Sequence, residues 1–191
     1  LEDIRSLSRA FAKAELRPNT ERWDAERSFD DDVVPKLGEL GFMGMLVSEK
    51  DGGMGFDPRY LAATLEEFAW GEPAIAAVVA QTTLAADVIT TYGTPEQRAK
   101  WLDGIAAGDL VGCVAYGEEP GAIETYATRE RGGWQMDGRK RYVVNGDLAH
   151  LAIVLARTDE GNALFAVPRE RGINITARAE TMGMRAVALV D

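Results

Sequence analysis

Two short segments carry the residue types that could bind a flat, polar cofactor. The first follows an apolar run with strand-like alternation, and the second precedes the Asn145-Gly146 turn. Strand ends that turn at glycine bring backbone N–H groups and a few side chains to one edge of a sheet. A cofactor can be held at such an edge. The first segment reaches the Pro120-Gly121 pair, and the second is the run Arg141-Tyr142-Val143-Val144.

Other reactive side chains are few. The sequence has one histidine, His150, and one cysteine, Cys113, so a zinc site of His and Cys or a Ser-His-Asp triad is disfavoured. A carboxylate metal site stays open, but we assign no metal ligand. We expect Glu66 and Glu67 on a helix surface or in capping contacts, and we assign no catalytic residue in this chain.

Composition excludes several classes of function. The 191 residues carry a formal charge of −10, which argues against a nucleic-acid partner and against docking on an anionic membrane. The single cysteine suits a reducing compartment, and no signal sequence is visible. We therefore expect a cytoplasmic protein. The most apolar window, residues 73–92, contains several threonines and Asp87 and is expected to be too polar for a membrane span.

The hydrophobic period changes near residue 109. Residues 1–109 show helical spacing, with an N-cap and proline at Asp57-Pro58 and a capping box from Thr94 to Gln97. Residues 110–191 alternate with period two. We expect strands at 110–116, 125–129, 134–137, 141–144, 151–157, 163–167 and 173–178. The pattern predicts an α+β protein, with an all-α domain at 1–109 followed by an antiparallel, barrel-like or sandwich domain at 110–191.

Segments along the whole chain resemble, in order, motifs of the acyl-CoA dehydrogenase family. They are LGFMG (40–44) with GGMG (52–55), LEEFA (65–69), YGTPEQ (92–97) with WL (101–102), EPGA (119–122), GRKRYVVNG (138–146) and MGMR (182–185). Each motif is weak alone, but their shared order makes the resemblance specific.

The resemblance implies an FAD enzyme of lipid metabolism and fatty acid β-oxidation. In this family a carboxylate base removes the α proton of an acyl-CoA thioester, and the β hydrogen leaves as hydride to flavin N5. Electrons usually pass on to an electron-transferring flavoprotein, and members form homo- or hetero-oligomers. By resemblance, the residues that line the flavin are Tyr116, Gly117, Glu118, Tyr142, Val143 and Val144. The base belongs to a C-terminal helical domain, which we expect to lie outside this sequence.

The sequence departs from the family pattern at the flavin segments. Glu118 and Val144 stand where the family has threonines, so two hydroxyl groups are lost. Loops after Ala122 and Ala186 are short, and we expect the natural protein to carry further loop residues there, with true deletion as the alternative. Two other functions stay open: a non-catalytic, flavin-poor partner subunit of a heteromeric complex, and a monooxygenase of the same fold that uses reduced flavin and oxygen.

Overall fold

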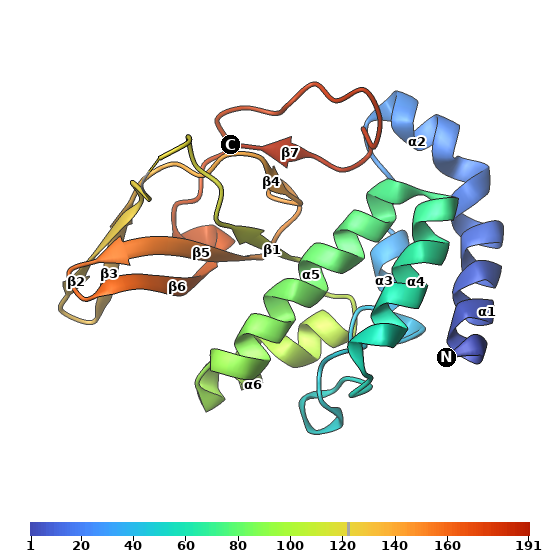
Figure 1. The fold of residues 1–191 in the computed structure, drawn as a ribbon, viewed down its shortest axis with the longest axis horizontal. Helices are drawn as coiled ribbons and strands as arrows, with labels where there is room; N and C mark the ends of the chain where they lie inside the picture. Colours follow the sequence, from blue (N-terminus) through green and yellow to red (C-terminus); the bar gives the residue numbers. More distant parts are fainter. Residues whose placement is uncertain (122) are drawn as a thin grey trace.

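The computed structural model describes residues 1–121 and 123–191, so Ala122 of the predicted EPGA motif lies outside the described residues. A helical half precedes a β half (Figure 1), which confirms the α+β class. The helices are α1 (Glu2–Phe11), α2 (Thr20–Glu26), α3 (Val33–Glu39), α4 (Pro58–Gly71), α5 (Pro73–Tyr92) and α6 (Pro95–Ala106). The strands are β1 (Gly112–Ala115), β2 (Tyr126–Glu130), β3 (Gly133–Asp137), β4 (Val143–Val144), β5 (Leu151–Thr158), β6 (Gly161–Pro168) and β7 (Leu189–Val190).

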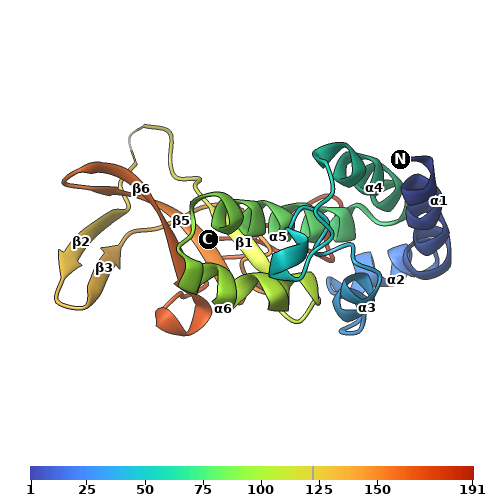
Figure 2. The same cartoon turned by 90° about the horizontal axis from the view of Figure 1, so that it is seen from below.

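Helix α5 lies between the two halves. It packs against α4 and α6 on the helical side and against β1 on the sheet side, while α1 and the β2–β3 hairpin lie at opposite ends of the molecule (Figures 1 and 2). By length and composition α5 could cross a membrane, contrary to the expectation that its sequence is too polar. Its place in the core accounts for this apolarity, since 56% of its most apolar window is buried.

Local capping signals position α4 and α6 as predicted. The Asp57 side chain accepts a hydrogen bond from the Arg59 N–H at the start of α4. At the start of α6, the Thr94 hydroxyl accepts from the Gln97 N–H, and the Gln97 side chain accepts from the Thr94 N–H. These contacts satisfy backbone donors that have no partner within the first helical turn.

The sheet is mixed, whereas the sequence pattern predicted an antiparallel one. β1 runs parallel to β5, with Gly112 opposite Leu151, while β5–β6 and β2–β3 are antiparallel hairpins. Parallel strands need a long crossover, and here the β2–β3 hairpin and β4 lie in the connection between β1 and β5. A separate pair, β4 with β7, completes the β half, and the described strands form no closed barrel.

Two predicted strands differ from the structure. The expected strand at 173–178 is absent, and only Arg178 forms an isolated bridge, to Val190. The expected strand at 141–144 is reduced to Val143–Val144, because Tyr142 has φ +56°, which is incompatible with an extended strand.

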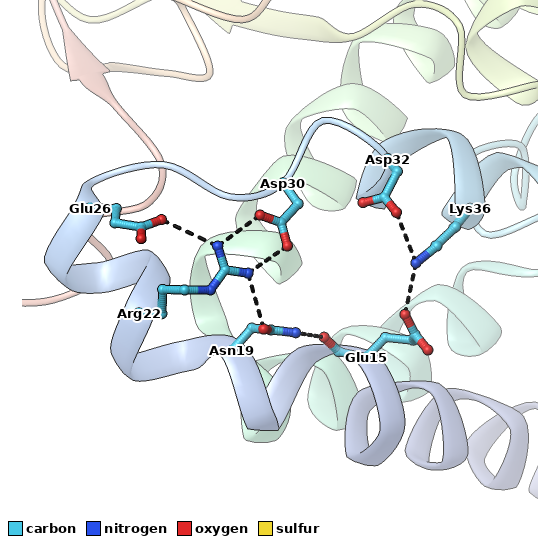
Figure 3. Close-up of polar contacts among 7 residues, drawn as sticks. All are labelled: Glu15, Asn19, Arg22, Glu26, Asp30, Asp32 and Lys36. Carbon is cyan, nitrogen blue, oxygen red and sulfur yellow. Dashed lines mark hydrogen bonds and ion pairs between the residues drawn. The ribbon is translucent and has the colours of Figure 1, made fainter.

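A network of charged and polar side chains on the surface joins the segment around α2 to α3 (Figure 3). Its members are Glu15, Asn19, Arg22, Glu26, Asp30, Asp32 and Lys36. The Arg22 guanidinium lies 2.6 Å from Asp30, and the Lys36 ammonium lies 2.9 Å from Glu15. All of these charges are solvent-exposed or half-exposed, so water and salt screen them and each pair adds little to the stability of the fold.

We predict that Gly112→Ala destabilises the protein, because a Cβ there would lie 2.7 Å from the Cβ of Ala85 on α5. Overpacking of this kind costs about 1–3 kcal/mol. The measurement is the free energy of unfolding in urea. Gly133→Ala on β3 is the matched control, because a Cβ there meets nothing within 4 Å. Equal stability of the two variants would contradict the close α5–β1 contact.

Candidate functional site

The structure brings the two predicted cofactor segments together. Tyr116, Gly117 and Glu118 follow β1, and Tyr142 directly precedes β4. The Arg141 N–H donates a hydrogen bond to the Gly117 carbonyl across 2.9 Å, so the segments lie side by side. A Cβ on Gly117 would lie 2.8 Å from the Arg141 carbonyl oxygen, which explains a glycine at this contact. The predicted juxtaposition is therefore present.

Two exposed tyrosines flank this contact. Tyr116 is 64% exposed and Tyr142 is 58% exposed. Tyr142 adopts the left-handed conformation with φ +56°, which costs a non-glycine residue about 1–3 kcal/mol. Its N–H donates to the Asp191 carboxylate at 3.1 Å, and the Arg141 guanidinium lies 5.0 Å from its ring centroid. The surrounding contacts thus hold an aromatic ring at the surface.

The two valines of β4 are placed differently from Tyr142. Val143 is buried in the core of the β half, and Val144 packs partly against the helical core. Their backbones pair with Val190 and Leu189 of β7. The side chains of these two valines therefore pack inside the protein. At the surface the two residues can offer a ligand only their backbone groups.

The carboxylate of Glu118 is buried and fully engaged by the protein. It forms an ion pair with Lys140, and the two side chains are 8% and 9% exposed. It also accepts hydrogen bonds from the N–H groups of Glu124, at 2.5 Å, and Thr125, at 3.2 Å. Burial alone would raise the pKa of Glu118, but the hydrogen bonds from Lys140 and the two peptide groups outweigh it and lower the pKa to about 2.

Sequence reasoning missed Lys140 and Asp191 as parts of this site. Asp191 lies beside β7 and accepts hydrogen bonds from Arg139 and the Tyr142 N–H. One signal in the sequence could have indicated the Lys140 contact. The acidic pair Glu118-Glu119 and the basic pair Lys140-Arg141 lie in segments that were expected to meet.

A cavity of about 440 Å³ is bordered by Lys140. Small and apolar side chains of β1 and β5, including Cys113, Ala115 and Ala152, line it together with Lys140 and Arg169. Among the predicted site residues that the structure describes, Val143 borders this cavity. Tyr116 and Tyr142 do not line this cavity, so the predicted cofactor edge lies on the protein surface.

The remaining reactive side chains have structural roles. Glu67 is buried, contrary to the expectation of a helix surface, and it pairs with Arg5 and Arg9 between α4 and α1. Cys113 is buried in the β-half core, and burial raises the pKa of its thiol to about 12, opposed by the charge of Arg169. The His150 Nδ1 accepts a hydrogen bond from the Val111 N–H at 3.1 Å.

The ion pair predicts an acid-dependent loss of stability. Because the pKa of Glu118 falls from its ordinary 4.5 to about 2 in the folded protein, its stabilising contribution is present above pH 4.5 and is lost as the pH falls toward 2. We expect the Glu118 carboxyl carbon to titrate near pH 2 by NMR, and Lys140→Met to move this midpoint upward. The Glu118→Gln variant should lose less stability over the same interval. A midpoint near 4.5 in the folded protein would contradict the pairing.

Comparison with known proteins places the chain among flavoenzyme relatives. Residues 1–109 match the family model "Acyl-CoA dehydrogenase, N-terminal domain", and residues 115–191 match "Acyl-CoA dehydrogenase, middle domain". The mitochondrial short-chain specific acyl-CoA dehydrogenase of Sus scrofa is 33% identical over 96% of this chain and 47% of its own length.

Solved structures share the fold. A glutaryl-CoA dehydrogenase of Mycobacterium smegmatis in complex with FADH2 superposes with a TM-score of 0.92 and 29% identity, over 99% of this chain and 50% of that chain. A chain solved in work on the electron transferring flavoprotein of Acidaminococcus fermentans has a TM-score of 0.92 and 28% identity, over 99% and 53%. The chain spans about half the length of the relatives it matches. It belongs to the acyl-CoA dehydrogenase family.

Proposed function

We propose that this chain forms the helical and middle domains of an FAD-dependent acyl-CoA dehydrogenase, which oxidises the α,β bond of an acyl-CoA thioester. The observation that carries the proposal is the pair of exposed tyrosines on segments joined by the Gly117–Arg141 hydrogen bond. Aromatic rings at a surface, one of them in a strained backbone conformation, are suited to contact a flat ring system. Family membership and a relative in complex with FADH2 support the choice of flavin.

The residues fit a flavin better than the sequence alone suggested. A free carboxylate at Glu118 would oppose the negative charge of reduced flavin, but here Lys140 neutralises it. In this proposal Tyr116 and Tyr142 offer their rings, while Gly117, Glu118, Val143 and Val144 offer backbone groups. When bound, FAD supplies the redox chemistry by accepting a hydride. The protein residues bind and orient the ring, and none of the described carboxylates is assigned as the base.

Partners follow from the same proposal. An acyl-CoA is the substrate, an electron-transferring flavoprotein is the electron acceptor, and the protein is an oligomer. The likeness to a chain studied with such a flavoprotein supports the acceptor. The cytoplasmic location is inferred from the single cysteine and stays a prediction. The absence of a membrane span also stays a prediction.

A second candidate function is a non-catalytic partner subunit. It is favoured by the loss of both family hydroxyls, because the Glu118 carboxylate is engaged internally and Val144 cannot donate a hydrogen bond. An absorbance spectrum of the intact purified protein distinguishes the two. A flavin spectrum that bleaches with an acyl-CoA supports the dehydrogenase, and a colourless protein that co-purifies with a homologue supports the partner subunit.

We predict that Tyr142→Ala weakens FAD binding about two- to tenfold, the loss expected when an aromatic contact worth about 0.5–1.5 kcal/mol is removed. FAD fluorescence titration of the intact protein measures it. Tyr92→Ala is the matched control, since Tyr92 is a 79% exposed tyrosine at the end of α5. Equal FAD affinity in both variants would remove Tyr142 from the proposed site.

A further inference from the structure

We propose that the Glu118–Lys140 ion pair is a positioning device that fixes the two segments carrying Tyr116 and Tyr142 in one arrangement for the flavin. This inference rests on the proposed function. The pair stands apart in burial: among the ion pairs of the described residues, it is the one in which both side chains are less than a tenth exposed. A buried pair with full hydrogen bonding holds its partners in a defined geometry.

The Glu118 carboxylate connects three parts of the β half. Its contact with Lys140 reaches the segment before β4, and its hydrogen bonds to Glu124 and Thr125 reach the entry to β2. The Thr125 carbonyl in turn accepts from the Arg157 N–H, at 2.8 Å, on β5. The loop after β1 is therefore anchored through one carboxylate to the sheet and to the segment that carries Tyr142.

A second set of contacts continues the connection. Arg141, next to Lys140, donates its N–H to Gly117 and pairs its guanidinium with Glu119. Gly117 and Glu119 thus both contact Arg141, and Glu118 between them contacts Lys140. The outer pair is solvent-accessible and contributes little, so we assign the positioning to the inner, buried pair.

A threonine at position 118 would act differently from the glutamate. The family's threonine offers a hydroxyl to the flavin, whereas Glu118 directs its side chain to Lys140 and to backbone N–H groups. A threonine is too short to make these contacts together. If position 118 serves only as a flavin ligand, Glu118→Thr should tighten FAD binding. If it positions the segments, the same change should weaken it.

The test compares Glu118→Gln, Glu118→Thr, Lys140→Met and the double variant Glu118→Gln/Lys140→Met in the intact protein. FAD affinity is measured by fluorescence titration, and amide hydrogen exchange is measured without flavin. The exposed Arg27–Glu180 pair, at 2.7 Å, supplies the control variants Arg27→Met and Glu180→Gln. Urea unfolding checks that each variant is folded. Glu118→Gln is the mildest change, so it can still be measured if Lys140→Met proves unstable.

We expect Glu118→Thr and Lys140→Met to weaken FAD binding about two- to tenfold, up to the loss expected when the Tyr142 ring itself is removed. In the double variant Glu118→Gln/Lys140→Met, the loss of FAD-binding free energy should be smaller than the sum of the losses in the two single variants, because the two residues act together. Exchange should accelerate at the Arg141 amide, which bonds to Gly117 and not to the altered side chains. The control variants should change FAD affinity less than twofold.

The outcomes separate this inference from the proposed function. Tighter binding in Glu118→Thr, or unchanged exchange at Arg141 in all variants, overturns the positioning role. A folded wild-type protein that does not bind FAD overturns the proposed function and the flavin part of the inference. In that case, faster exchange at Arg141 in the variants still supports the pair as the device that holds the two segments together.

Discussion

The close packing of β1 on α5 is the constraint on which the arrangement of the β half depends. Gly112 leaves room for the two backbones to approach, and the Thr82 hydroxyl lies 3.4 Å from both its N and its O. The same helix also holds the residue after β4, because the Asn145 side chain donates to the Val78 carbonyl at 3.2 Å. One helix therefore holds the start of β1 and the turn after β4, and so fixes where these two strands lie relative to each other.

The Asn145 contact illustrates how a polar group serves this packing. Asn145 is fully buried at φ +65°, a conformation that asparagine tolerates better than most residues. Its backbone N–H donates to the Ala188 carbonyl, next to β7, so the turn joins β4 and β7 to the helix as well. The turn predicted from Asn145-Gly146 exists, but its role is to dock the small β4–β7 sheet on α5 and not to form a hairpin.

Local signals in the sequence were sufficient for the helices and the fold class. The caps at Asp57 and Thr94 act within a few residues, so their chemistry is readable from spacing alone. Contacts between residues far apart in the sequence were harder to predict. The parallel pairing of β1 with β5 depends on a crossover, and Glu67 is buried because α1 supplies two arginines. The segment predicted as a strand at 173–178 lies beside β7, but it pairs there over a few residues only, around the Arg178–Val190 bridge. The family resemblance predicted that segments 116–118 and 142–144 lie at one edge, but the contacts through Lys140 and Arg141 required the structure.

The two departures from the family pattern differ in physical kind. At position 118 a hydroxyl is replaced by a charge, and that charge is compensated, because Lys140 and two peptide N–H groups surround it. At position 144 a hydroxyl is replaced by a methyl group that packs on the helical core, and a packed valine needs no partner. The side chain of Val144 is therefore accommodated by packing, whereas the charge of Glu118 is accommodated by Lys140 together with two peptide N–H groups. The pair is a coupled feature of this chain, and a change at either residue alone leaves a buried charge without its counterion.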